Sequence, residues 1–402
     1  MTGALYWTEA ELDGSFAAQV LPDAARLLSC IQCGSCTASC PTAHRMTVVP
    51  QRLARLVHLG LKEEALDPLS FWLCTSCHAC TTVCPRGLPI LDLVVGLKEY
   101  AISRGLDVPE ELHVLRNTIL NQRNISGDPN EERLLWNANL PRPLPLVEGR
   151  ADGGVLYFLG CVASLYPRAY SIPQSFGRLL TAAGVRFGVL GRDEWCCGFP
   201  LYNAGLKQEM AALVEHNVRR VRELGVGTLV MTCPSCYYAW KVLYPRFASL
   251  PSSLSIVHGS QILAELLDAK RLKPASVPRA VTYHDPCDLG RKSGEYDAPR
   301  HVLRSIPGLE LREMANIRDN ALCCGGGGDV KIYSNDTTME VSRRRLQQAL
   351  DVDAGTVVSA CQQCKRALVS AVQWMRQPVK VADLTELLWE SVSENVSEDA
   401  EC

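Results

Sequence analysis

Two cysteine patterns of the same form occupy the second half of the chain and could bind metal. The first comprises Cys161, Cys196-Cys197 and Cys233-Pro-Ser-Cys236, and the second comprises Cys287, Cys323-Cys324 and Cys361-Gln-Gln-Cys364. Corresponding cysteines lie 126, 127 and 128 residues apart, so the pattern is an internal duplication. A glycine follows each adjacent pair and allows close backbone approach. Such regular thiolates favour a metal or iron–sulfur site over cysteines that only fill a core.

Two further cysteine runs near the N-terminus match the bacterial ferredoxin spacing C-x2-C-x2-C-x3-C-P. Three cysteines at this spacing can hold one cubane, and the fourth leaves on the following segment to reach the other cluster. Two zinc knuckles would instead require paired C-x2-C units without the C-x3-C-P tail. We therefore expect two 4Fe–4S cubanes, one on Cys30, Cys33, Cys36 and Cys84 and the other on Cys74, Cys77, Cys80 and Cys40.

The composition is that of a globular protein with an unusual number of cysteines. The chain has 402 residues, 47% of them hydrophobic, and a net charge of −2, which gives no indication of nucleic-acid binding. The basic run Arg343-Arg344-Arg345 is expected to be a solvated helix face. No signal peptide and no apolar stretch of membrane-spanning length is visible, so we expect the cysteines to be reduced in the cytoplasm. Eighteen of the 19 are expected to be ligands, and Cys402 is expected to have no function.

The elements that must position these cysteines change in character along the chain. The periodicity of Val49–Leu66 predicts one or two short helices between the ferredoxin runs, and the proline-rich stretch Pro141–Gly154 predicts a linker. Beyond it, short apolar runs alternate with amphipathic stretches, which is typical of α/β lobes. The expected strands are Val155–Leu159, Val185–Leu190, Leu229–Thr232, Ala280–Tyr283, Leu309–Glu313 and Thr356–Ser359, and the expected helices are Ser175–Ala183, Leu206–Leu224, Ala298–Ser305 and Thr338–Leu350.

These patterns predict an α+β multidomain fold with three parts. The parts are a helical ferredoxin-like domain with two cubanes over residues 1–145 and two duplicated cysteine-rich α/β lobes over 154–270 and 271–395. In each lobe the cysteines follow strands, at the sheet edge where open α/β sheets place their sites. We expect the two copies to face each other across a pseudo-twofold axis and to share one cleft.

Two stretches of the second copy could add chemistry to its cysteines. The glycines of Gly325–Gly328 lack the Lys-Ser/Thr of a phosphate loop, and they are better explained by backbone closing on a cluster. His284 and Asp285 precede Cys287 and could orient a ligand or donate protons, or could simply pack.

The residues quoted above resemble a known family. Residues 30–100, with CIQCGSCTASCP and FWLCTSCHACTTVCPRGL, resemble the C subunit of heterodisulfide reductase, and residues 154–390, with two Cys-Cys-Gly frames, resemble its B subunit. A fusion of the two is similar to the D subunit of the membrane-associated enzyme. The resemblance implies two noncubane 4Fe–4S clusters, one on Cys161, Cys196, Cys197, Cys233 and Cys236 and one on Cys287, Cys323, Cys324, Cys361 and Cys364.

The resemblance also implies a function and partners. In the family the noncubane clusters face one pocket and split a small-molecule disulfide, with electrons arriving through the cubanes. No G-x-G-x-x-G motif follows a strand, so a flavin- or haem-containing subunit must supply electrons, and a membrane subunit is a further candidate partner at the inner membrane.

Two alternatives remain open at this point. The chain is also similar to iron–sulfur subunits of glycolate oxidase and glycerol-3-phosphate dehydrogenase, which implies an electron relay to quinone without a substrate site. In the other alternative, a structural zinc occupies four thiolates of one frame, which leaves the fifth cysteine unexplained.

Overall fold

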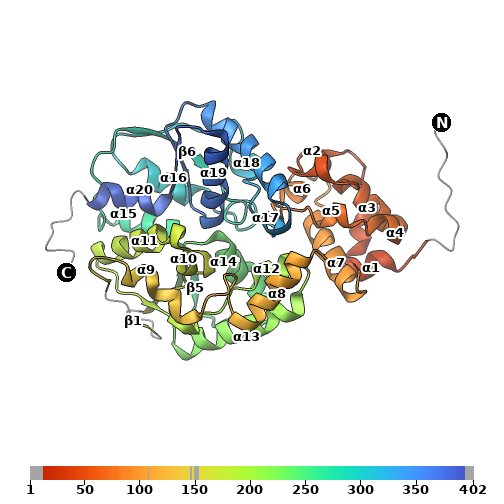
Figure 1. Cartoon of the computed structure of the whole chain (residues 1–402), viewed down its shortest axis with the longest axis horizontal. Helices are drawn as coiled ribbons and strands as arrows, with labels where there is room; N and C mark the ends of the chain where they lie inside the picture. Colours follow the sequence, from red (N-terminus) through yellow and green to blue (C-terminus); the bar gives the residue numbers. More distant parts are fainter. Residues whose placement is uncertain (1–11, 107, 145–146, 149–153, 394–402) are drawn as a thin grey trace.

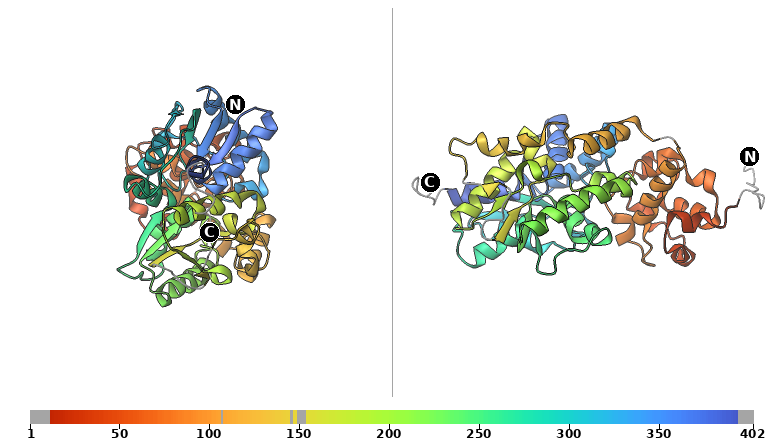
Figure 2. Two further views of the ribbon diagram at one scale, coloured as in Figure 1. Left: turned by 90° about the vertical axis from the view of Figure 1, so that its left-hand side faces the viewer. Right: turned by 90° about the horizontal axis from the view of Figure 1, so that it is seen from below.

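The computed structural model describes residues 12–106, 108–144, 147–148 and 154–393. A helical N-terminal unit lies at one end of the elongated molecule, and two α/β lobes lie together at the other end (Figure 1). The view from below shows the same arrangement (Figure 2). The predicted fold class, a helical domain followed by two α/β lobes, is confirmed.

The N-terminal unit consists of short helices that hold two cysteine loops. Its α-helices are α1 (Phe16–Val20), α2 (Ser35–Ala38), α3 (Pro50–Leu59), α4 (Lys62–Ala65), α5 (Pro68–Phe71), α6 (Ala79–Thr82) and α7 (Ile90–Ser103). Helix α3 begins with a proline at its first turn and ends at Leu59, and the following Gly60, with a φ of 75°, closes the helix in the left-handed conformation. Helices α3 and α4 confirm the prediction for residues 49–66. Phe16, Val57 and Leu93 are fully buried in the core of this unit.

The first lobe contains a five-stranded sheet in which all strands are parallel. The strand order is β1-β3-β2-β4-β5. The strands are β1 (Val147–Glu148), β2 (Val155–Tyr157), β3 (Gly188–Val189), β4 (Thr228–Met231) and β5 (Ser255–His258). The helices of this lobe are α10 (Cys161–Leu165), α11 (Ser171–Ala182), α12 (Phe199–Asn203), α13 (Lys207–Glu223), α14 (Pro234–Tyr238) and α15 (Gly259–Asp268).

The second lobe repeats the first with one strand fewer. Its parallel sheet has the order β7-β6-β8-β9, which matches β3-β2-β4-β5 of the first lobe. The strands are β6 (Arg279–His284), β7 (Leu309–Leu311), β8 (Thr356–Ser359) and β9 (Lys380–Asp383). The helices are α16 (Asp297–Arg304), α17 (Val330–Tyr333), α18 (Asn335–Leu350), α19 (Gln362–Met375) and α20 (Leu384–Ser393). Helices α11 and α20 pack against each other, as do α15 and α16, and join the lobes.

The segment between the N-terminal unit and the first lobe is more structured than its proline content indicates. Strand β1 lies inside the predicted linker and extends the first sheet. Helices α8 (Glu110–Gln122) and α9 (Leu135–Ala138) precede it, and α9 packs on α10 and α11 of the first lobe. The predicted domain boundaries remain predictions, but these contacts attach α9 to the first lobe.

Candidate functional site

The two ferredoxin-type loops have left-handed backbone at the same two positions. Gln32 and Gly34 flank Cys33 with φ values of 55° and 81°, and Ser76 and His78 flank Cys77 with 54° and 65°. Left-handed backbone is uncommon for residues other than glycine, so its recurrence at matching positions indicates a functional constraint. These turns curl each C-x2-C-x2-C run around a cavity.

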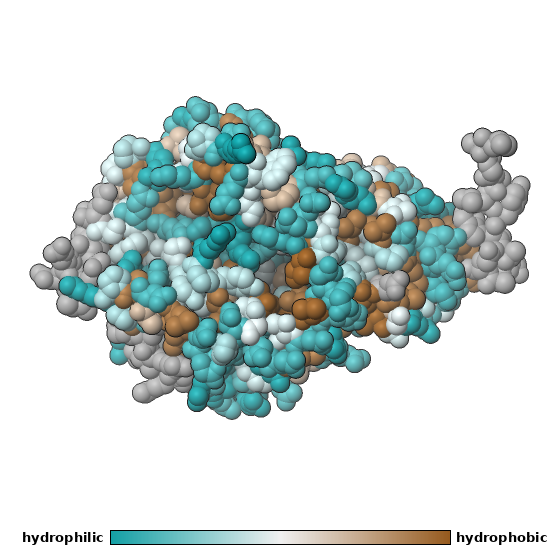
Figure 3. Space-filling view, viewed as in Figure 1, coloured by the Kyte–Doolittle hydropathy of each residue, from teal (hydrophilic) through white to brown (hydrophobic). Residues whose placement is uncertain are grey.

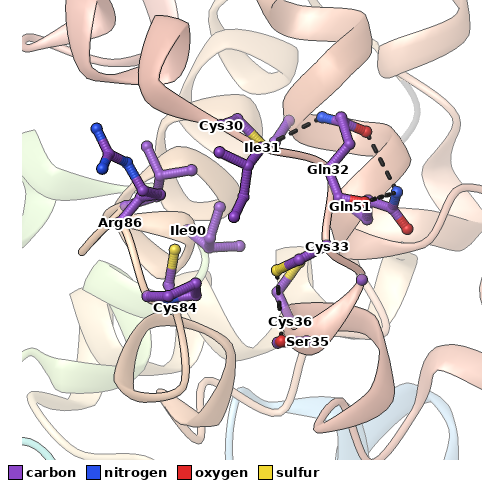
Figure 4. Close-up of a pocket in the computed structure, with 14 residues that line it drawn as sticks. Cys30, Ile31, Gln32, Cys33, Ser35, Cys36, Gln51, Cys84, Arg86 and Ile90 are labelled. Carbon is purple, nitrogen blue, oxygen red and sulfur yellow. Dashed lines mark hydrogen bonds between the residues drawn. The ribbon is translucent and has the colours of Figure 1, made fainter.

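The first cavity contains cysteines from both runs. Cys30, Cys33, Cys36 and Cys84 line about 360 Å³ of space that is partly open to solvent, and their side chains gather around it in Figure 4. Gln32 donates a hydrogen bond from Nε2 to the sulfur of Cys30 at 3.1 Å. The structure therefore places the fourth cysteine of the second run beside the first three of the first run.

The second cavity contains the complementary set. Cys74, Cys77 and Cys80, together with Cys40, line about 450 Å³ of space that is partly open to solvent. Burial raises the pKa of Cys40 to about 12, and the charge of Cys77 adds to the effect. Grouping four thiols in a buried cavity disfavours their thiolates unless a cation is bound, so this donor set fits an iron–sulfur cluster.

Replacing Cys40 by serine tests the crossing of the two runs. We expect loss of the cluster in the cavity of Cys74, Cys77 and Cys80, because Cys40 faces that cavity and not the nearer one. Electron paramagnetic resonance and iron content measure the loss, and Ser39→Ala, which changes a neighbouring side chain, is the control. Selective loss of the signal from the Cys30–Cys33–Cys36 site would contradict the assignment.

The five cysteines of the first frame lie close together, and each thiol interacts with at least one other. Cys161 begins α10, the adjacent pair lies before α12, and Cys233 caps α14, where Cys236 sits. The Cys161 thiol interacts with Cys196, and Cys236 interacts with both Cys197 and Cys233. Hydrogen bonds from the Cys196 and Cys236 thiols lower the pKa of Cys197 to about 6. The structure thus brings all five sequence-predicted residues together.

A buried arginine from outside the cysteine pattern supports the first frame. Arg133 and Glu194 are both fully buried and lie 2.9 Å apart. Arg133 also donates to the Cys161 sulfur at 3.4 Å, and Glu194 accepts hydrogen bonds from the backbone amides of Leu159 and Gly160. The pair therefore fixes the turn into Cys161 and places a positive charge beside its sulfur, which favours the thiolate.

The second frame is assembled in a similar way from four of its five cysteines. Cys323 interacts with Cys324, and Cys364 interacts with Cys324 and Cys361. Cys323 also interacts with the thiol of Cys77, which belongs to the N-terminal unit. Cys287 influences Cys323 only through its charge and lies on the wall of a larger cavity.

His284 lies beside this frame and is oriented by a buried arginine. Its ligand atoms come within 4.8 Å of the sulfurs of Cys324 and Cys364. Arg345 Nε donates to His284 Nδ1 at 2.9 Å, so that nitrogen is an acceptor and the imidazole is neutral. The expectation that Arg345 belongs to a solvated face is wrong, since its side chain is fully buried. Asp285 instead pairs with Arg300 at 2.6 Å, a packing role.

The N-terminal unit and the second frame are in direct contact. Arg291 donates from Nε to the Cys77 carbonyl at 2.8 Å and from Nη1 to the Ala321 carbonyl at 2.7 Å. The glycines of the CCGGGGD stretch also allow this approach, because a Cβ on Gly327 would lie 2.7 Å from the carbonyl oxygen of Thr75. These contacts place the second N-terminal cavity directly against the second frame.

A large cavity lies where the two lobes meet the N-terminal unit. It holds about 1270 Å³ of space that opens to solvent, and apolar side chains gather near this junction in Figure 3. All five cysteines of the first frame line it, whereas the second frame contributes Cys287. Gly326 and Gln363, which lie close in sequence to the remaining second-frame cysteines, line the cavity and are joined by a 3.0 Å hydrogen bond from Gln363 to the Gly326 carbonyl. The predicted shared cleft therefore exists, but the two frames contribute unequally to it.

The polar wall of this cavity joins all three units. Ser76 donates to Asn203 at 2.8 Å, and Lys292 donates to Ser76 at 3.2 Å and pairs with Asp288 at 2.7 Å. Ser235 completes the series with a 2.6 Å hydrogen bond to Asp288. The spacing of the cysteines does not predict these residues. The only local indication in the sequence is the charged stretch Asp-Leu-Gly-Arg-Lys directly after Cys287.

Comparison with known proteins agrees with this architecture. Residues 26–88 match the 4Fe-4S dicluster domain, and residues 155–241 and 281–369 match the Cysteine-rich domain. A hypothetical protein from Helicobacter pylori shares the fold with a TM-score of 0.52 and 12% identity, over 85% of this chain and 65% of that one. Fold and site define an iron–sulfur protein with one dicluster domain and two cysteine-rich domains.

The curated relatives show which family of iron–sulfur proteins the chain belongs to. The D subunit of dihydromethanophenazine:CoB--CoM heterodisulfide reductase from Methanosarcina mazei is 31% identical, over 90% of this chain and 93% of that protein. EtfAB:quinone oxidoreductase from Syntrophomonas wolfei is 27% identical, over 90% of this chain and 58% of that one. The chain belongs to the family of the heterodisulfide reductase D subunit, and it is an iron–sulfur oxidoreductase. Within its described part, the chain offers no helix with the length and apolar character needed to span a membrane.

Proposed function

We propose that this chain reduces a small-molecule disulfide in the cavity between its lobes, as one component of a larger complex. The observation that carries the proposal is that cysteines of both frames line this one open cavity. When bound, the clusters supply one-electron transfer, with cubanes in the two N-terminal cavities and noncubane 4Fe–4S clusters on the two five-cysteine frames.

The side chains of the cavity suit a disulfide. Phe199, Val162 and Ile125 provide apolar wall that excludes water from a bound sulfur pair. Lys331 and Arg366 also line the cavity, and their positive charges stabilise negative charge that develops on sulfur when the S–S bond breaks. Arg366 stacks over Tyr166 at 4.3 Å, which holds its guanidinium in place.

The electron donor is expected to dock at the first N-terminal cavity. Cys33 is exposed there, and Leu28 and Ile31 expose 72% and 63% of their surface. A flavin- or haem-containing subunit fits this position, since the described residues include no nucleotide-binding loop of their own. A membrane subunit would attach the complex to the inner membrane, with the chain itself on the cytoplasmic side.

Metal analysis together with a turnover assay tests this proposal. Anaerobic preparations are expected to contain about sixteen iron atoms per chain, the number required by four 4Fe–4S clusters. Reduced methyl viologen should drive reduction of 3,3′-dithiodipropionate, with cystamine as a cationic comparison that Lys331 and Arg366 disfavour. About eight iron atoms with zinc would contradict the noncubane sites. Quinone reduction without any disulfide turnover would favour the electron-relay function instead.

A further inference from the structure

The glycine-rich stretch after Cys324 carries an acidic residue to the wall of the large cavity. Gly327 and Gly328 must lack side chains because the backbone of Cys74 and Thr75 occupies that space. The next residue, Asp329, has a φ of 62°, a left-handed conformation that glycine adopts more readily. A fifth glycine would adopt this conformation without strain, but the residue here is an aspartate whose carboxyl group lies at the cavity.

The carboxyl group of Asp329 lacks the partners that buried acids normally have. Its Oδ2 atom is buried, and no hydrogen bond to it exists within the described part of the chain. An unsatisfied buried oxygen destabilises the fold, so its presence calls for a functional reason. Burial raises the pKa of Asp329 to about 7, although the charge of Lys98 acts in the opposite direction.

No ion pair involving Asp329 exists among the described residues. Lys98 on α7 is buried and donates to the carbonyl of Asn203 at 3.0 Å. The phenol of Tyr333, one turn further along, is also buried without a hydrogen-bond partner among the described residues. Helix α8 contributes the apolar Leu115 to the cavity. The other charged groups that line the cavity are Lys331, Arg366 and Asp288, the last of which is paired with Lys292.

We propose that Asp329 is the acid that protonates a product sulfur in the cavity, an inference that rests on the disulfide reduction proposed above. The S–S bond breaks, and two electrons come from the reduced electron donor. The O–H bond of Asp329 breaks and its proton goes to one thiolate sulfur, while the second thiolate takes a proton from solvent. The Asp329 carboxylate then regains a proton from solvent through the cavity opening.

Replacing Asp329 by asparagine tests the role in proton transfer. With reduced methyl viologen and 3,3′-dithiodipropionate, the native kcat is expected to fall as pH rises above about 7, because the acid form is lost. In Asp329→Asn this fall should disappear and kcat at pH 6.5 should drop about 100-fold, the scale of general acid catalysis. Asp329→Glu should restore part of the rate, and Asp336→Asn, an exposed acid on α18, is the matched control.

A readout that does not depend on turnover checks that Asp329→Asn is folded. Because the pKa of Asp329 is higher in the folded state, its carboxyl group ionises at lower pH in the unfolded chain than in the folded chain. Asp329 therefore lowers the stability of the folded state progressively from about pH 4 to 7. Asp329→Asn should therefore gain melting temperature relative to the native chain at pH 8 and not at pH 4, with unchanged iron content. An unchanged kcat profile in Asp329→Asn would overturn this role alone. Absence of disulfide turnover in the native chain would overturn the proposed function, and this role with it.

Discussion

Serine in place of Cys324 is expected to abolish disulfide reduction while the N-terminal sites remain reducible. Cys324 is the acceptor at the centre of the second frame, where the thiols of Cys323 and Cys364 both interact with it. Removing its sulfur deprives the frame of the atom that joins its other thiols. We expect turnover to fall by about three orders of magnitude, the scale on which loss of one essential group acts in other active sites.

The same experiment on the first frame tests whether both frames, or only the second, take part in disulfide reduction. Cys197 holds the corresponding central position, so Cys197→Ser should reduce turnover as severely as Cys324→Ser. Reduction of the N-terminal sites by methyl viologen, followed by electron paramagnetic resonance, should persist in both variants because neither variant removes a cysteine that lines those cavities. Cys402→Ser, at a thiol outside both frames, is the control. Native turnover in Cys197→Ser would exclude participation of the first frame.

Substituting Arg133 by methionine is expected to destabilise the fold strongly. Glu194 would remain buried with no cation to compensate its charge, which destabilises proteins by about 3–5 kcal/mol. The neighbouring pair of Asp193 and Arg220 is partly exposed, so Arg220→Met should lower stability by only about 0–1 kcal/mol.

Anaerobic denaturant titration measures both changes. Adding Glu194→Gln to Arg133→Met should recover part of the loss, because the amide keeps an acceptor for the turn before Cys161 and carries no charge. Equal stabilities for Arg133→Met and Arg220→Met would show that burial of the pair does not matter.

Much of the fold could be predicted because buried parallel strands leave a clear signal. Strand β8 is apolar enough to be recognised, and the structure places it at Thr356–Ser359, all four residues buried. Strands β5 and β9 were not predicted because they begin with an exposed residue and their interior is only partly buried. Strand β1 has two residues within a proline-rich stretch, so its local sequence carries no strand pattern.

The cysteines of the site could be predicted from the sequence, but the residues that support them could not. Spacing identified which cysteines group together, since ferredoxin runs exchange their fourth member in a fixed way. Arg133 lies 28 residues before its partner Cys161. It belongs to a short helical segment of ordinary composition, so the sequence around it does not predict the contact with Cys161. Arg345 was assigned to solvent because charged residues are mostly exposed, whereas the acceptor nitrogen of His284 holds it in the interior.

The contact between the second lobe and the loop of Cys74 and Thr75 has a consequence for how the protein is made. Cys323 and Thr75, whose side chains meet across it, are 248 residues apart in the chain. A contact of such long range forms late, because a ribosome must synthesise almost the whole protein first. Until then the face of the N-terminal unit around Cys77 is uncovered, so the cysteines of the second N-terminal cavity are accessible from that side before the second lobe closes on them.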